Sequence, residues 1–123
     1  MKLRIKADSV RLRLTRSEVE SIGAGRDVRE TTHFAGGHTL EYALEPSTND
    51  HLEAQFEDQR LIVRAPAAVL VEWAAGDTVT VACPTAVGSP SILVEKDFSC
   101  LSPRAGDDDE DAFPHPEEGT RTC

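Results

Sequence analysis

Hydrophobic residues occupy every second position at the start of the chain. Residues 3–5 and 10–14 alternate a hydrophobic residue with a charged one, and Ala7-Asp8-Ser9 separate the two segments. Successive side chains of a β-strand point to opposite faces, so this period indicates two strands that each have one apolar face. The pattern predicts a β-hairpin with a basic outer face.

A short helix is expected after the hairpin. Thr15 and Glu18 have the spacing of a capping box, in which each side chain accepts a hydrogen bond from the backbone of the other residue. The helix is expected to run through Ile22, before two glycines. Strands are expected over 28–34 and 40–44, with a glycine turn between them and a loop at 46–50.

The same order of patterns follows in the second half. Alternating segments at 52–56 and 61–65 flank a turn at 57–60. Pro66 suits the first turn of a helix that runs to Trp73, because proline lacks the N–H that this turn leaves unpaired. Further strands are expected over 79–83 and 92–94.

Hydrophobic positions of the two halves coincide at an offset of 51 residues. Leu12 then falls on Val63, and Val19 on Leu70. This agreement predicts an internal duplication of a ββαββ unit, over 1–50 and 51–100. The alternative is chance, because any two runs of alternating strands match in this way.

These elements predict an α+β fold, mainly β, with two short helices. Eight short strands would form a small barrel or sandwich. A chain of 123 residues supports one hydrophobic core, so we expect a single β-rich domain at 1–100 and an acidic tail at 101–123. No apolar run is long enough for export or for a membrane span, and we expect a cytoplasmic protein without membrane contact.

Charge is distributed unevenly along the chain. The net charge of −9 argues against nucleic-acid binding, although residues 1–16 carry six basic residues and only one acidic residue. The tail carries the acidic run 107–111. This run could dock on the basic hairpin, or the hairpin could receive a protein partner or a second copy in a homodimer. The cations that would carry this contact are Lys2, Arg4, Arg11 and Arg13.

The tail also contains residue types that bind metals. Cys100, His115 and Cys123 supply thiolates and an imidazole, the preferred ligands of zinc and other transition metals, and Asp109 and Asp111 could complete the shell. A structural disulfide is not expected in a reducing compartment. The spacing matches no known ligand pattern, so the alternative is a solvated acidic tail.

Glu30 is the one carboxylate at an expected inward position of the folded body. If Val28 points inward, so does Glu30, and burial would indicate a ligand site in the barrel interior with His33 and His38 nearby. The alternative is a strand that ends early and leaves Glu30 in water. Catalytic motifs such as GxSxG, GxGxxG and HExxH are not present, so an enzyme is the less favoured class.

Three segments resemble a known family. They are 2–19 (KLRIKADSVRLRLTRSEV), 94–100 (VEKDFSC) and 111–114 (DAFP). Together they are similar to a bacterial domain family of unknown function, and the likeness covers nearly the whole chain. This resemblance implies a small cytosolic protein and assigns no catalytic residue. The sequence therefore favours a non-enzymatic binding or accessory protein whose tail takes a metal ion or a partner. One alternative is a small-molecule binder or an enzyme of unrecognised type that uses the barrel interior, and the other is a protein-interaction module.

Overall fold

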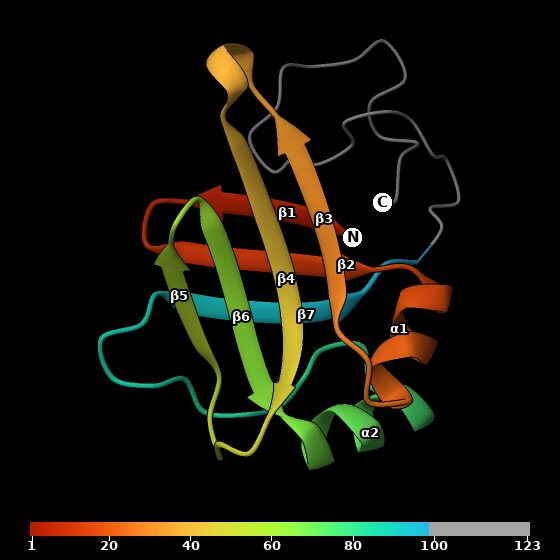
Figure 1. The fold of residues 1–123 in the computed structure, drawn as a ribbon. Coiled ribbons are helices and arrows are strands. Elements are labelled where there is room, and N and C mark those ends of the chain that lie inside the picture. The colour runs from red at the N-terminus through yellow and green to blue at the C-terminus, as the bar shows by residue number, and fades with distance from the viewer. Residues whose placement is uncertain (99–123) are drawn as a thin grey trace, which may run out of the picture.

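The computed structural model describes residues 1–98 of the chain. Over this range, seven strands form two sheets with the orders β1-β2-β7 and β3-β4-β6-β5, and two α-helices pack together beside them (Figure 1). The elements are β1 (Lys2–Lys6), β2 (Ser9–Leu14), α1 (Arg16–Gly23), β3 (Val28–His33), a 3-10 turn (Ala35–Gly37), β4 (Thr39–Ser47), β5 (Glu53–Glu57), β6 (Arg60–Pro66), α2 (Ala67–Ala75) and β7 (Ser91–Lys96).

Both hairpins form where the alternating pattern predicts them. β1 pairs antiparallel with β2, with Leu3 opposite Leu12, and β5 pairs antiparallel with β6 in the same way. The turns need positive φ angles, and Ala7, Asp58 and Gln59 supply them at 48°, 53° and 63°. Tight two-residue turns between antiparallel strands favour such angles because they match the twist of the strands.

The two helices start as their sequences indicate. Thr15 Oγ1 accepts a hydrogen bond from Glu18 N at 3.4 Å and Glu18 Oε1 accepts one from Thr15 N at 2.8 Å, which confirms the capping box of α1. α2 follows Pro66 directly. Each helix buries two residues three positions apart, which is the spacing of neighbours on one helix face.

Each hairpin extends a sheet that contains a strand from the other half of the chain. β2 pairs in parallel with β7, and β6 pairs in parallel with β4. The strands of the three-stranded sheet run across those of the four-stranded sheet, one layer behind the other (Figure 1). The two halves are therefore interlocked.

One hydrophobic core lies between the layers. Leu12 and Ile22 from the first half pack in the same buried cluster as Val63, Leu70 and Val94 from the second. Burying a side chain of this size stabilises a fold by roughly 1.5–3 kcal/mol. The sheets and both helices are thus held together by a single shared interior.

Three expectations need correction. The α+β, mainly β class is confirmed, but the sheets share no strand and do not close, so a closed barrel is wrong. The expected strand at 79–83 is reduced to one bridge, Thr80 to Glu95, because the chain then turns away to pair with Leu52 through Pro84 and Ala86. β4 continues to Ser47 through part of the expected loop, because it stays paired with β6.

Helices α1 and α2 have lengths of 8 and 9 residues, and neither helix of the described chain is long and apolar enough to cross a bilayer.

Candidate functional site

Five cationic side chains occupy outward positions of the β1–β2 hairpin. The inward positions of β2 are buried and apolar, so the alternation places the remaining side chains on the opposite side of the sheet. We call this surface the basic face, and its members are Lys2, Arg4, Lys6, Arg11 and Arg13.

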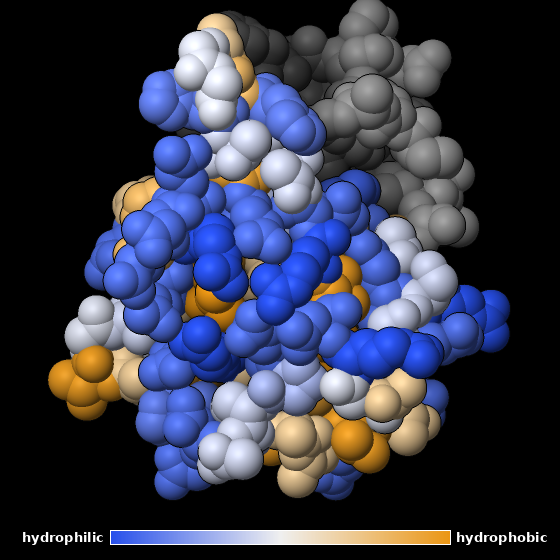
Figure 2. Space-filling view, in the orientation of Figure 1, coloured by the Kyte–Doolittle hydropathy of each residue, from blue (hydrophilic) through white to orange (hydrophobic). Residues whose placement is uncertain are grey.

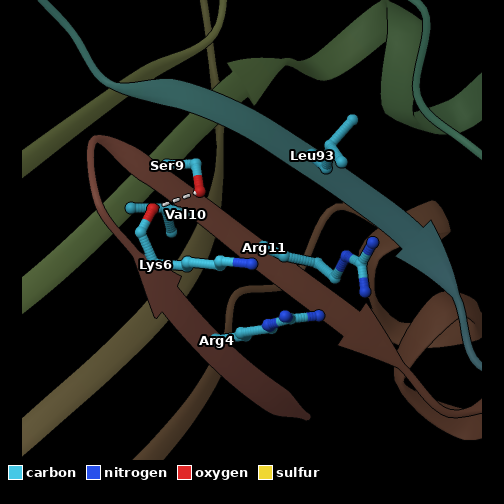
Figure 3. Close-up of a pocket in the computed structure, with 6 residues that line it drawn as sticks. All are labelled: Arg4, Lys6, Ser9, Val10, Arg11 and Leu93. Carbon is cyan, nitrogen blue, oxygen red and sulfur yellow. Dashed lines mark hydrogen bonds between the residues drawn. The ribbon is translucent and has the colours of Figure 1, made fainter. Parts of the chain in front are cut away.

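A hollow of about 160 Å³ lies on the basic face (Figure 3). Arg4, Lys6 and Arg11 line it, and their side chains extend over the same side of the hairpin. Ser9, Val10 and Leu93 complete the lining. Arg4 and Arg11 are directly opposite each other in the strand register. Like charges placed in this way repel, so the fold itself gains nothing from their pairing.

Glu95 and Asp97 pair with three cations of this face. Glu95 Oε1 lies 2.9 Å from Arg13 Nε and 3.4 Å from Arg11 Nε. Asp97 Oδ2 lies 3.0 Å from Lys2 Nζ. Lys6 makes no ion pair within residues 1–98. The basic face therefore has at least one cation, Lys6, that no carboxylate of residues 1–98 neutralises.

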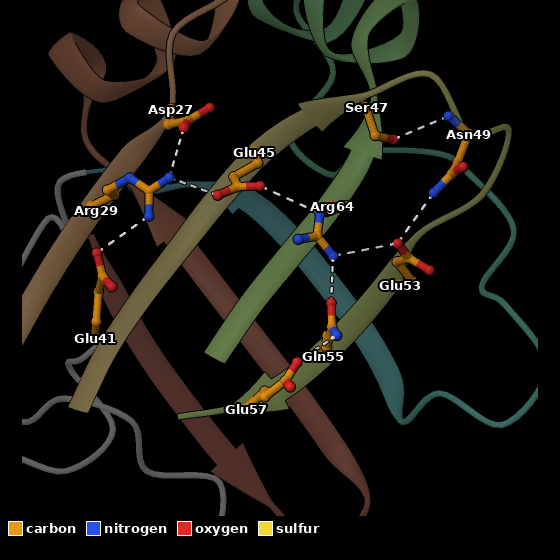
Figure 4. Close-up of polar contacts among 10 residues, drawn as sticks. All are labelled: Asp27, Arg29, Glu41, Glu45, Ser47, Asn49, Glu53, Gln55, Glu57 and Arg64. Carbon is orange, nitrogen blue, oxygen red and sulfur yellow. Dashed lines mark hydrogen bonds and ion pairs between the residues drawn. The ribbon is translucent and has the colours of Figure 1, made fainter. Parts of the chain in front are cut away.

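The outer face of the four-stranded sheet differs, because its charges are matched by neighbours (Figure 4). Arg29 contacts Asp27 at 2.8 Å, Glu45 at 2.7 Å and Glu41 at 3.2 Å. The hydrogen bond to Asp27 is the main cause that raises the pKa of Arg29 above its ordinary value; partial burial opposes it. Figure 2 shows this face covered by hydrophilic side chains, with only small hydrophobic patches between them.

One arginine–glutamate pair occurs on both sheets at equivalent places. Arg13 is opposite Glu95 in the β2–β7 ladder, and Arg64 is opposite Glu45 in the β6–β4 ladder. The Nε to Oε1 distances are 2.9 Å and 3.3 Å. The two arginines are 51 residues apart in the sequence, and each follows a buried aliphatic residue, Leu12 or Val63. This pair therefore belongs to the way each hairpin joins its parallel strand.

The cations that line the hollow are not repeated on the second hairpin. At the same offset, the other hairpin carries Gln55, Glu57 and Ile62 in place of Arg4, Lys6 and Arg11. The second hairpin forms the same five cross-strand pairs, at the offset of 51 residues, without these charges. The fold therefore does not require the cations that line the hollow.

Glu30 lies against the amino terminus. β3 continues past it to His33, and the strand neither ends early nor leaves the carboxylate unpaired. Glu30 Oε1 is 3.0 Å from the Met1 ammonium, and Glu18 Oε2 is 2.6 Å from the same group. Tyr42 Oη donates to Met1 O at 3.2 Å. The side chain of Glu30 is 43% exposed, so it is neither fully buried nor free in solvent.

The pKa values in this cluster follow from its contacts. Desolvation lowers the pKa of the Met1 ammonium, but its hydrogen bonds to Glu18 and Glu30 outweigh that effect and the pKa is raised. Desolvation raises the pKa of Glu18, but hydrogen bonds from the amino terminus and from Thr15 outweigh it and the pKa is lowered. The cluster ties the start of β1 to α1 and β3.

The histidines that were expected to accompany Glu30 lie elsewhere on the surface. His33 ends β3 on the outward side, opposite in direction to Glu30, and His38 follows the 3-10 turn; both are exposed. Within residues 1–98, no three His, Cys, Asp or Glu side chains are placed to hold a metal ion. The ligand-binding role of Glu30, His33 and His38 stays a prediction.

The expected zinc ligands, namely Cys100, Asp109, Asp111, His115 and Cys123, lie outside the described residues. Metal binding by the tail therefore also stays a prediction.

The sequence alone did not predict the whole hollow. Lys6 shares the outward period of Lys2 and Arg4, so its place was readable from the alternation. Ser9 is the cross-strand neighbour of Lys6 and donates its hydroxyl to Lys6 O at 2.6 Å. Leu93 comes from β7, and no local pattern indicates that this distant strand lies beside β2.

Over residues 1–98, these observations define two interlocked sheets, one of which carries a cationic outer surface. The chain belongs to DUF7009, a family of unknown function whose model matches residues 1–117, and this confirms the resemblance seen in the sequence. Comparison with curated proteins and with solved structures gives no match. The function must therefore be argued from the site itself.

Proposed function

We propose that this chain is a non-catalytic binding protein whose basic face receives an acidic segment of a partner protein. The observation that carries this proposal is the contrast between the two hairpins. Arg4, Lys6 and Arg11 line a hollow on one hairpin, and the equivalent hairpin folds in the same way without them.

A purely protective role explains only some of these cations. Charged residues on an edge strand hinder edge-to-edge aggregation, and β1 is an edge strand. Arg11 and Arg13 lie on β2, which is paired on both sides and needs no such protection. Protection of the edge therefore does not account for the central part of the basic face.

The chemistry of the surface favours carboxylates on a peptide over a nucleic acid. A chain with a net charge of −9 repels a long polyanion as a whole, whereas a short acidic segment meets only the local positive field. Alternate cations along a strand are spaced by about 7 Å, which matches alternate carboxylates on an extended peptide. An extended acidic segment is the ligand that suits this face.

The two halves also support an evolutionary proposal. Hairpin and helix recur at the offset of 51 residues, and both halves keep the arginine–glutamate pair described above. We infer an internal duplication in which one copy of the hairpin gained the basic hollow. In this interpretation, the β5–β6 hairpin is the unspecialised copy.

Binding of a short aspartate-rich peptide tests the proposed function. In a chain whose acidic run 107–111 is neutralised (D107N/D108N/D109N/E110Q/D111N), so that it cannot compete with the peptide, the double variant Lys6→Gln/Arg11→Gln should weaken binding by about fivefold, because each exposed ion pair contributes about 0–1 kcal/mol. Fluorescence anisotropy of a labelled peptide at about 20 mM salt measures the affinity, which should fall further at about 0.5 M salt. Arg13 keeps its contact with Glu95, so the variant should remain folded.

The matched control is Arg26→Gln/Arg60→Gln, which removes the same charge at exposed positions away from the basic face. In the same neutralised-run chain, this control should bind the peptide as the chain without the arginine changes does. Equal losses in the two double variants would show that only net charge matters, and the proposed site would be wrong.

A further inference from the structure

The described chain ends beside the basic face. β7 ends at Lys96, and the next residue, Asp97, reaches Lys2 at the start of β1 with a distance of 3.0 Å between Oδ2 and Nζ. Asp97 N also donates to Leu14 O at 2.9 Å, which fixes this position on the end of β2. Whatever follows residue 98 therefore begins at one end of the face that carries the hollow.

The acidic run 107–111 lies within reach of the hollow. Nine residue steps separate Phe98 from Asp107, and an extended chain covers at most about 3.3–3.6 Å in each step, or about 30 Å. Lys6 is four positions along β1 from Lys2, a distance of about 14 Å at the rise of a strand. The connection is thus long enough to place the run over Arg4, Lys6 and Arg11.

The charges of the two parts are complementary. The run Asp107-Asp108-Asp109-Glu110-Asp111 has five consecutive carboxylates. The basic face has five cations, and one of them, Lys6 beside the hollow, makes no ion pair within residues 1–98. No other part of the sequence has as dense a run of acidic residues.

We propose that the run 107–111 of the same chain occupies the basic face, so that an acidic partner must displace it. This inference rests on the proposed function and names the regulation of that site. A segment held by a short linker has a local concentration in the millimolar range. Exposed ion pairs are individually weak, so the contact is reversible and sensitive to salt. The run then lowers the affinity for a partner without abolishing it.

The test uses the full chain with the run neutralised, D107N/D108N/D109N/E110Q/D111N. Its matched control is E117Q/E118Q, which neutralises acidic residues outside the run. Amide NMR spectra without any peptide report the docking directly. Neutralising the run should shift the amides of Lys6, Arg11 and Leu93 at low salt, while the control should leave them unchanged. The affinity for the aspartate-rich peptide should rise about tenfold, as expected when a tethered competitor is removed.

The possible outcomes separate this inference from the proposed function. If the amides do not shift and peptide affinity is unchanged while both chains bind the peptide, self-docking is wrong and the proposed function stands. If the amides shift but neither chain binds the peptide, the run docks and the proposed function is wrong. Shifts that grow with protein concentration would indicate contact with a second copy and would overturn docking within one chain.

Discussion

Glu18 shows how one side chain stabilises two parts of the molecule. Oε1 accepts a hydrogen bond from Thr15 N at 2.8 Å and closes the cap of α1, while Oε2 lies 2.6 Å from the Met1 ammonium at the start of β1. The cap was readable from the sequence because it depends on a spacing of three residues. The contact with Met1 was not, because it joins residues that only the folded chain brings together.

We predict that Glu18→Gln lowers the free energy of unfolding by about 1 kcal/mol near neutral pH, because the amide can still accept the cap hydrogen bond but cannot form the ion pair with the Met1 ammonium. The pKa of Glu18 is lowered in the folded chain, so its ionised form stabilises the fold above the ordinary pKa of 4.5, and this contribution is lost as the pH falls through the lower, folded value. The difference between the two chains should therefore shrink in acid.

Urea denaturation at about pH 7 and about pH 3 measures this difference. Glu20→Gln, an exposed change in the same helix, is the control and should have little effect at either pH. A Glu18→Gln deficit that persists unchanged in acid would contradict the assigned ion pair.

At the scale of elements, local patterns predicted most of the structure and distant pairings explain the errors. Both hairpins and both helices appeared where alternation, capping and proline placed them. The strand expected at 79–83 failed, because that segment leaves β7 after a single bridge and pairs with Leu52 instead. The parallel pairing of β2 with β7 joins segments about 80 residues apart, and no local signal encodes it.

The contact between α1 and α2 gives a prediction at this scale. A Cβ at Gly23 would lie 2.8 Å from the Cβ of Ala74, which is too close for two side-chain carbons. Alanine favours a helix over glycine by about 1 kcal/mol, but overpacking costs about 1–3 kcal/mol. We therefore expect Gly23→Ala to destabilise the protein despite its better helix propensity.

A double-mutant cycle measured by thermal or urea unfolding separates the two effects. Ala74→Gly removes the opposing Cβ, so the chain with both changes should be more stable than the sum of the two single changes predicts. A stabilising Gly23→Ala, or strict additivity, would show that the helices are not in close contact at this point.

At the scale of the whole molecule, the two sheets present different outer surfaces. The four-stranded sheet carries a ladder in which Arg29 and Arg64 are matched by carboxylates, whereas the three-stranded sheet carries the basic face. The sequence predicted the basic outer face of the hairpin, because alternation alone places Arg4 and Arg11 there. It did not predict the hollow, since Leu93 joins it from β7, about 80 residues further along the chain.

The most direct test of the basic face is to map the aspartate-rich peptide onto the full chain that carries the neutralised run. Titration followed by amide NMR should shift residues of β1, β2 and β7, with the largest changes at Lys6, Arg11 and Leu93, and should leave β3, β4, β5 and β6 unchanged. Shifts centred on the four-stranded sheet, or no shifts at low salt, would contradict the assignment of the basic face as the binding site.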